Sequence, residues 1–506
     1  EWRSASAPIR GGRYVKVANE FDSLELAGGV RGGASTVASQ VYNGLFEQRA
    51  CYYSDTAVAP VLVKSWQVSA DGLTWTFKLK ENVKWQNKPP VNGRPFTSAD
   101  VAWLIDYHKT GGGAFKSLWA DVDHQTPDAT TVVMKLPKAD ADFLARLGHR
   151  ENVVVPKEIK EQFGDYKTMA VGTGAFMVKE VQMGQTLLAE RNPNYWEMGK
   201  DGKALPYLDE VRHVFFADQA TELASFRAGQ LDHTRFTGLR MQDVEPMRQA
   251  LPKAKYHPQL VFSFSALWFN MDKAPFNNVN VRKAFALAVD PEDVLASLGG
   301  PTSGVYAGFV PAFLDEYAWT EQKIKERAKP NIEQAKKLLA DAGVKPDELK
   351  PLLKTSSTYR QEAEVVQQQL KKLGVDAQIE VEGAIFSPIL AQRKFDIAWG
   401  VTGGFVFANY WVGDFLRSGE TGNVIKLSDP QIDQLVDAQR KELDVAKRRQ
   451  LLDQMQERLY ELMPFRPVVS NYYHHMVSCR VQNYRRVNPS YNTSQVLEAW
   501  LDNSGC

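Results

Sequence analysis

The sequence carries almost no net charge and contains no long apolar run. Its 506 residues include 61 lysines and arginines against 60 aspartates and glutamates, so it lacks the basic field that binding to nucleic acid or to an anionic membrane surface requires. No apolar stretch approaches the roughly 20 residues that cross a bilayer. The 44% apolar content is ample for folded cores, and the length indicates about three domains.

Cysteine is also scarce. Cys51, Cys479 and Cys506 allow at most one internal disulfide, and the three pairings remain open. The plain expectation for each is a buried or terminal thiol. No CxxC spacing occurs, which argues against a zinc site or a thiol redox site.

Motifs of catalysis and of cofactor binding are missing. The sequence has no GxSxG elbow, no HExxH pair and no phosphate-binding loop, and the glycines of GTGAF (172–176) lack the third glycine of a dinucleotide loop at Met177. Its eight histidines are scattered except for His474 and His475, which would point to opposite faces of a strand. We therefore expect no cofactor, no metal site and no enzyme. A hydrolase on the same scaffold is the alternative, which turnover of peptides or glycosides would reveal.

Apolar and polar residues alternate clearly in one segment near the start of the chain. Leu73, Trp75, Phe77 and Leu79 alternate with polar residues after an Asp-Gly turn, which predicts a strand with one buried face. Thr97 with Asp100 three residues later predicts a capped helix. An earlier strand is expected over 13–18.

Helix signals dominate the second half. Asn331 predicts a helix start and Gly343 its end, and a second stripe over 363–373 ends at Gly374 before an alternating strand over 375–381. Two more helices are expected to begin after Asp429 and Asp444, the second ending before Pro464. Helices interleaved with strands indicate a layered α/β fold.

Ordered motifs run along nearly the whole chain. The opening reads SW-x-VS-x-DG, TWTFKL, VKW and PFT-x-x-DV between residues 65 and 101. The later motifs, in order, are GTGAF (172–176), RNPNYW (191–196), PYLDEV (206–211), FRAGQLD (226–232), FNMDKAPFNNVNVRKAFALAVD (269–290), AKKLLADAG (335–343), FDIAWG (395–400) and RRQLLDQMQERLYELMPFRPV (448–468). Each motif alone is weak, but together they closely resemble the extracytoplasmic solute-binding proteins of family 5. Those proteins deliver dipeptides, oligopeptides, nickel chelates and some sugars to ABC importers.

The resemblance implies an α/β type II periplasmic-binding-protein fold, with two lobes that close on a solute about a hinge and an extra inserted domain. By analogy, lobe I covers 1–45, 172–263 and 477–506, the inserted domain covers 46–171, and lobe II covers 264–476. Two hinge crossings are expected near 263–269 and near 477–483. These boundaries come from the resemblance, and periodicity does not supply them.

The resemblance places a ligand-binding loop after the strand that begins at Phe395. In peptide-binding relatives this loop carries an aspartate that pairs with the α-amino group of the ligand, whereas here Phe405 aligns near that position and the next carboxylate is Asp414. An ammonium in a dry site needs a partner charge, so this departure weakens the peptide interpretation. We expect the ligand to contact aromatic rings of this segment and backbone groups that its glycines leave accessible. These contacts are Trp399, Gly403, Gly404, Phe405, Tyr410 and Trp411.

A second part of the ligand-binding site is expected in the turn that follows the first strand. Relatives place backbone facing the ligand there, which corresponds to Arg31, Gly32, Gly33 and Ala34. A helix expected over 35–46 would offer free N–H groups to an anionic or carbonyl group of the ligand. A plain flexible turn is the alternative for this segment.

These features predict the substrate-binding component of an ABC importer, with a peptide or other small molecule as ligand and an ABC transporter permease as partner. Oligosaccharides, aromatic or amphipathic organic solutes and metal chelates are the alternative ligands. A sensing or chaperone module without transport is the alternative role. We expect a monomer in the periplasm or elsewhere in the extracytoplasmic envelope. The chain starts at Glu1 without a nearby cysteine, so it is expected to be free, or to have lost a lipid anchor in processing.

Overall fold

The computed structural model of the chain describes most of its residues. These are 6–18, 23–24, 40–48, 58–112, 119–149, 152–235, 238–239, 241–383, 385–401, 407–484, 496–504 and 506. The chain divides into two compact units: unit 1 is Glu1–Pro258 with His474–Cys506, and unit 2 is Gln259–Tyr473. The expected second lobe is 264–476, and the three-part division into lobes and inserted domain stays a prediction.

Unit 1 contains two four-stranded sheets. In the first, β1 (Arg13–Ala18) pairs in parallel with β10 (Glu210–Phe215), and β9 (Thr186–Arg191) and β8 (Phe176–Gln182) follow antiparallel. The second is an antiparallel sheet in the order β4 (Val63–Val68), β5 (Thr74–Leu79), β7 (Thr131–Lys135), β6 (Asp123–Asp128). The predicted strands over 13–18 and 73–79 are thereby confirmed, and Trp75, Phe77 and Leu79 form the buried face of the latter.

Short helices and strand pairs complete unit 1. The helices are α2 (Ser98–Tyr107), continued by the π-helix η1 (His108–Gly112), and α4 (Phe143–Leu147), α5 (Lys157–Phe163), α6 (Gln219–Arg227) and α7 (Met241–Ala250). The strand pairs are β2 (Phe46–Gln48) with β3 (Val58–Pro60) and β18 (Val481–Gln482) with β19 (Trp500–Leu501). The helix expected over 35–46 lies mostly outside the described residues, and Phe46 belongs to β2.

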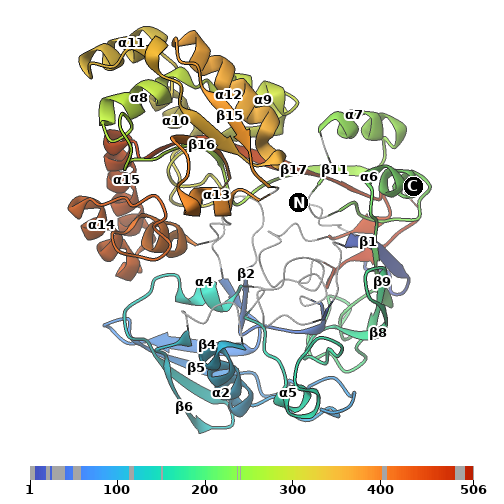
Figure 1. Cartoon of the computed structure of the whole chain (residues 1–506). Coiled ribbons are helices and arrows are strands. Elements are labelled where there is room, and N and C mark those ends of the chain that lie inside the picture. Colours follow the sequence, from blue (N-terminus) through green and yellow to red (C-terminus); the bar gives the residue numbers. More distant parts are fainter. Residues whose placement is uncertain are drawn as a thin grey trace. The chain divides into compact units, whose positions relative to one another are not determined.

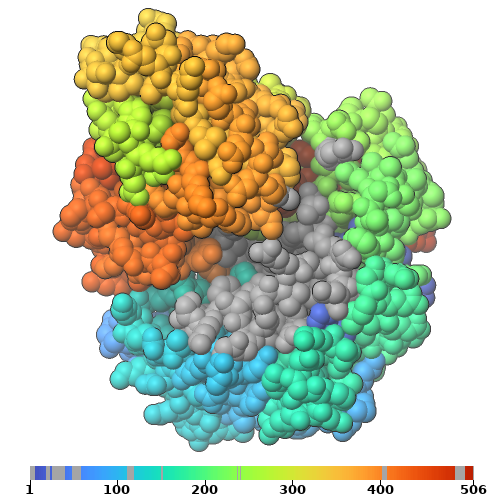
Figure 2. Space-filling view, viewed as in Figure 1, coloured from blue at the N-terminus to red at the C-terminus, as the bar shows by residue number. Residues whose placement is uncertain are grey.

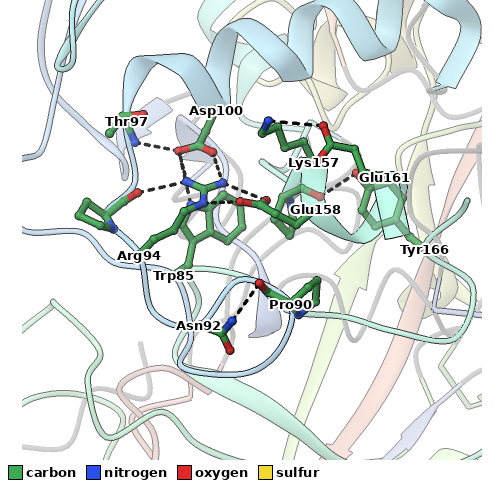
Figure 3. Close-up of polar contacts among 12 residues, drawn as sticks. Trp85, Pro90, Asn92, Arg94, Thr97, Asp100, Lys157, Glu158, Glu161 and Tyr166 are labelled. Atoms are coloured by element: carbon green, nitrogen blue, oxygen red, sulfur yellow. Dashed lines mark hydrogen bonds and ion pairs between the residues drawn. The ribbon is translucent and has the colours of Figure 1, made fainter. Parts of the chain in front are cut away.

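The predicted cap of α2 is part of a charged cluster. The backbone N–H of Thr97 donates to the Asp100 carboxylate at 2.8 Å, which confirms the cap. Arg94 lies between two carboxylates, with Nη2 2.6 Å from Asp100 Oδ1 and 3.0 Å from Glu158 Oε2 (Figure 3). Its guanidinium also lies over the Trp85 ring. The segment 93–100, which reads GRPFTSAD, thus joins α2 to α5.

Unit 2 is built on one sheet in the order β11 (Lys255–Leu260), β17 (Phe465–Val477), β12 (Ser265–Phe269), β16 (Ile397–Val401), β14 (Leu352–Thr355), β15 (Gln378–Val381), with β13 (Gly304–Tyr306) also paired to β17. β14 is parallel to both of its neighbours. β11 and β17 run through the two points at which the chain passes between units.

Helices surround this sheet. They are α8 (Val279–Ala288), α9 (Pro291–Ser297), α10 (Glu321–Arg327), α11 (Ile332–Asp341), α12 (Arg360–Lys372), α13 (Ser387–Gln392), α14 (Pro430–Lys441) and α15 (Val445–Leu462), with the 3-10 turns η2 (Pro301–Ser303), η3 (Pro346–Glu348) and η4 (Ser357–Tyr359) and the π-helix η5 (Asn409–Leu416). α8 packs beside α11, and α12 packs against β14, β15 and β16 (Figure 1). Figure 2 shows the outer surface of α11 and α12 in yellow and orange. α11 carries exposed ion pairs such as Lys336–Glu333.

The helix boundaries in unit 2 follow the predicted caps. The Asn331 side chain accepts from Gln334 N at 2.9 Å, and Gly343 follows the helix at φ +68°. Asp429 and Asp444 accept from the first turns of α14 and α15, and α15 ends before Pro464. Polar side chains that satisfy free N–H groups at helix starts explain why these ends were predictable.

One disulfide is present in the described residues. It joins Cys479 to Cys506, whose Cα atoms lie 5.6 Å apart. The expectation of free thiols is therefore wrong for these two residues, because the chain end returns to the segment after β17. Cys51 lies outside the described residues.

Candidate functional site

The carboxyl ends of β14 and β16 meet at one edge of the unit 2 sheet. Thr355 pairs with Trp399 across these parallel strands, and its hydroxyl donates to the Trp399 carbonyl at 2.9 Å. β12 runs antiparallel to β16 and begins at the same edge, where Ser265 pairs with Val401. The last residues of β14 and β16 and the first residue of β12 therefore share this edge.

The connections that leave this edge diverge. From β14 the chain passes through α12 to β15 on one side, and from β16 it passes through η5, α14 and α15 to β17 on the other side. A place where the connections from two neighbouring strands leave in opposite directions is called a topological switch point. In α/β sheets such a point generally leaves a crevice at the carboxyl ends of the strands, and ligands bind there. We define this edge, with the start of α12, as the switch-point edge.

Trp399 anchors α12 to this edge. Its side chain is 0% exposed, and Nε1 donates to Oε2 of Glu362 at 3.2 Å. Burial raises the pKa of Glu362 to about 7, although Ser265 and Trp399 act in the opposite direction. The Trp399 ring lies in the core of unit 2, where it holds a carboxyl group in place.

Trp411 and Tyr410 lie side by side in η5 but differ in burial. Trp411 is 0% exposed, and its Nε1 donates to the Phe309 carbonyl at 2.5 Å. Its ring packs against Phe264 and Phe415. Tyr410, by contrast, is 41% exposed. Of these two predicted contacts, Tyr410 is the one whose side chain reaches the surface.

The remaining predicted ligand contacts lie outside the described residues. They are Arg31, Gly32, Gly33, Ala34, Gly403, Gly404 and Phe405. The structure gives no geometry for them, and their role stays a prediction.

The sequence interpretation missed Glu362. The residue directly precedes the stripe predicted over 363–373 and lies one turn before Val366, and both Ala363 and Val366 are fully buried. An acidic residue one turn before a buried stripe residue was the available signal. Its buried environment became visible only when Trp399 was placed opposite it.

A cluster of buried histidines in unit 1 was also missed. The rings of His233 and His475 stack with centroids 5.3 Å apart, and His257 lies 4.9 Å from His475. Burial, followed by Lys16, lowers the pKa of His475 to about 3. The neighbouring His474 hydrogen-bonds Tyr256 at 2.8 Å instead, and the expectation that the adjacent pair does not chelate one metal stays a prediction.

Within the described residues, no group of three or more histidine, cysteine, aspartate or glutamate side chains is arranged to hold a metal ion. His233, His257 and His475 lie together through ring contacts.

The model of the family described as bacterial extracellular solute-binding proteins, family 5, middle, matches residues 57–423. This match covers most of the chain. The chain belongs to this family.

Relatives of this family 5 protein align with it over most of their length. It is 27% identical over 469 residues to the dipeptide-binding protein DppE of Bacillus subtilis, with 86% of this chain and 83% of DppE covered. The solved structure of DppA from Helicobacter pylori in complex with a peptide superposes with a TM-score of 0.76 at 22% identity, covering 97% and 98% of the two chains.

A further structural relative is AgaA of A. tumefaciens R10, in complex with agropinic acid. Its TM-score is 0.74 at 22% identity, with 97% of this chain and 99% of AgaA covered. These superpositions confirm the predicted type II periplasmic-binding-protein fold. The family consists of binding proteins that act outside the cytoplasm. None of the helices in the described part of this family 5 protein combines the length and the apolar composition that a bilayer crossing needs.

Proposed function

We propose that this protein captures a peptide or another small organic solute outside the cytoplasm and presents it to the permease of an ABC importer. Membership of family 5 over residues 57–423 carries this proposal. The dipeptide named for DppE and the peptide in the DppA complex favour peptides as the leading solute class.

The proposed binding surface in unit 2 is the switch-point edge. It combines the carboxyl ends of β14 and β16 with the start of α12. The segment that the resemblance identifies as ligand-binding follows Val401, the last residue of β16. Tyr410 is the proposed contact with a described, exposed side chain. The proposed contacts without described geometry are Gly403, Gly404, Phe405, Arg31, Gly32, Gly33 and Ala34.

Capture in this proposal requires no bond to be made or broken. Closure of the two lobes on the solute, which the resemblance implies, would shift the population toward a form that the permease binds. The protein acts as a monomer and not as an enzyme, in the periplasm or an equivalent compartment.

A second class of solute is favoured by one observation. Phe405 stands near the position at which peptide-binding relatives carry the aspartate for the α-amino group. The agropinic acid bound by AgaA is consistent with a family fold that accepts small organic acids. An aromatic or amphipathic organic solute, a sugar or a metal chelate is therefore the alternative to a peptide.

Native mass spectrometry of the protein as purified tests the proposal. The expected result is a population heavier than the apoprotein by the mass of one small solute, which denaturation releases for identification. A peptide supports the leading class, and a sugar or organic acid supports the alternative. A protein that carries no solute and binds none from a broad panel would contradict the proposed function.

A further inference from the structure

In the described part of the chain, Glu362 lacks the arginine partner that other buried carboxylates have. In four cases a buried acid is paired with an arginine: Asp100 with Arg94, Glu222 with Arg235, Asp232 with Arg480 and Asp429 with Arg458. Glu362 is 4% exposed, yet no cation pairs with it anywhere in the described residues. Its contacts are the indole N–H of Trp399 and the nearby hydroxyl of Ser265.

The position of Glu362 is at the switch-point edge. It is the third residue of α12, the helix that begins five residues after β14 ends at Thr355. Trp399, which holds its carboxylate, is the third residue of β16. The side chain thus lies where connections diverge and where a sheet of this kind binds its ligand.

The fold does not require an acid at this position. A buried carboxylate without a partner charge is destabilising, and burial raises the pKa of Glu362 to about 7. A glutamine would accept the same hydrogen bond from Trp399 without this cost. A charge that costs stability and lies at a binding edge is typical of a functional group.

We propose that Glu362 binds a cationic nitrogen of the captured solute, an ammonium or a guanidinium group, and that Trp399 is the positioning residue that orients its carboxylate. This inference rests on the proposed function and adds the charge of the solute to it. A cation would supply the missing partner through a charge-assisted hydrogen bond.

Binding would also release a proton. Because the pKa of Glu362 is raised to about 7 by burial, most of the carboxyl is protonated at pH 6. A bound cation favours the ionised form, so up to one proton leaves as the solute binds. Calorimetry in two buffers with different heats of ionisation measures this release, which a purely structural role of Glu362 would not produce.

The test compares Glu362→Gln with a matched control on the same helix. Glu364→Gln removes an exposed carboxylate that pairs with Arg360 at 2.8 Å. The probes are trilysine and its fully acetylated form, titrated into each protein by calorimetry. The wild-type protein should bind trilysine at least about tenfold more tightly than the acetylated form. Glu362→Gln should lose that preference and the proton release, and Glu364→Gln should keep both.

The outcomes separate this inference from the proposed function. If the wild-type protein and Glu362→Gln bind trilysine equally, the Glu362 assignment is wrong while solute capture stands. If Glu362→Gln weakens both probes alike, the carboxylate does not recognise a cation, and the assignment is again wrong. If neither peptide binds the wild-type protein, benzylammonium and benzyl alcohol replace them, and a lack of preference for benzylammonium overturns the assignment. Matching near-UV circular dichroism confirms that each variant is folded.

Discussion

Trp411 donates its indole N–H to the backbone carbonyl of Phe309, which lies 102 residues earlier in the chain. The bond joins η5 to the segment after β13 inside the core of unit 2. Tyr410, the neighbouring residue, is exposed instead. The two aromatic residues therefore have different roles despite their adjacency.

Substitution of these neighbours should separate stability from binding. Trp411→Ala removes a fully buried ring and is expected to lower the free energy of unfolding by about 3–5 kcal/mol. Tyr410→Ala should change it by less than about 0.5 kcal/mol and instead weaken solute binding. Urea denaturation and calorimetry measure the two effects. A stable Trp411→Ala protein with impaired binding would contradict the core role of this residue.

Acid should destabilise the protein through the buried histidines of unit 1. Burial, followed by Lys16, lowers the pKa values of His213 and His475 to about 3, and the same causes lower the pKa of His233. In the unfolded chain these groups bind protons near pH 6.5. These histidines therefore stabilise the folded state at neutral pH relative to acid. This contribution is lost as the pH falls from about 6.5 toward 3, because only the unfolded state takes up protons in that range.

Urea titrations at several pH values between 7 and 5 give the slope of the free energy of unfolding against pH. Three such histidines correspond to as much as about 4 kcal/mol per pH unit near pH 5.5. His475→Gln should remove about one third of the slope that these three histidines contribute, because one of their three rings is gone. A free energy that stays constant from pH 7 to pH 5 would show that these histidines are accessible to protons in the native state.

The disulfide between Cys479 and Cys506 should stabilise unit 1. It closes a segment with a sequence separation of 27, which in chain-entropy terms is worth about 2–4 kcal/mol. The double variant Cys479→Ser with Cys506→Ser should lose this amount in urea denaturation, and Cys51→Ser serves as the control. Thiol titration of the unfolded, unreduced protein should count one thiol per chain. Three thiols would exclude the bridge.

The sequence predicted the local elements well because their signals are local. Asn331, Asp429 and Asp444 mark helix starts by accepting from the N–H group three residues ahead. At the start of α2 the Thr97 N–H donates to the Asp100 carboxylate, which is equally local. Alternation in β5 likewise reflects one strand with one buried face. Such patterns need no knowledge of distant contacts.

The binding site was less accessible to prediction because burial depends on distant segments. Trp399 and Trp411 were expected to contact ligand, but both side chains are 0% exposed. Their N–H groups donate to Glu362 and to the Phe309 carbonyl. Nothing next to either tryptophan encodes those partners. The Cys479–Cys506 pairing and the contact of His233 with His475 also join residues far apart in sequence.

The most direct measurement titrates the solute recovered from the purified protein back into protein that has been unfolded, freed of ligand and refolded. Calorimetry should give one site per chain, and mass spectrometry of the solute afterwards should find it chemically unchanged. A solute that is converted to a product, or a recovered solute that does not rebind, would contradict the account of reversible capture.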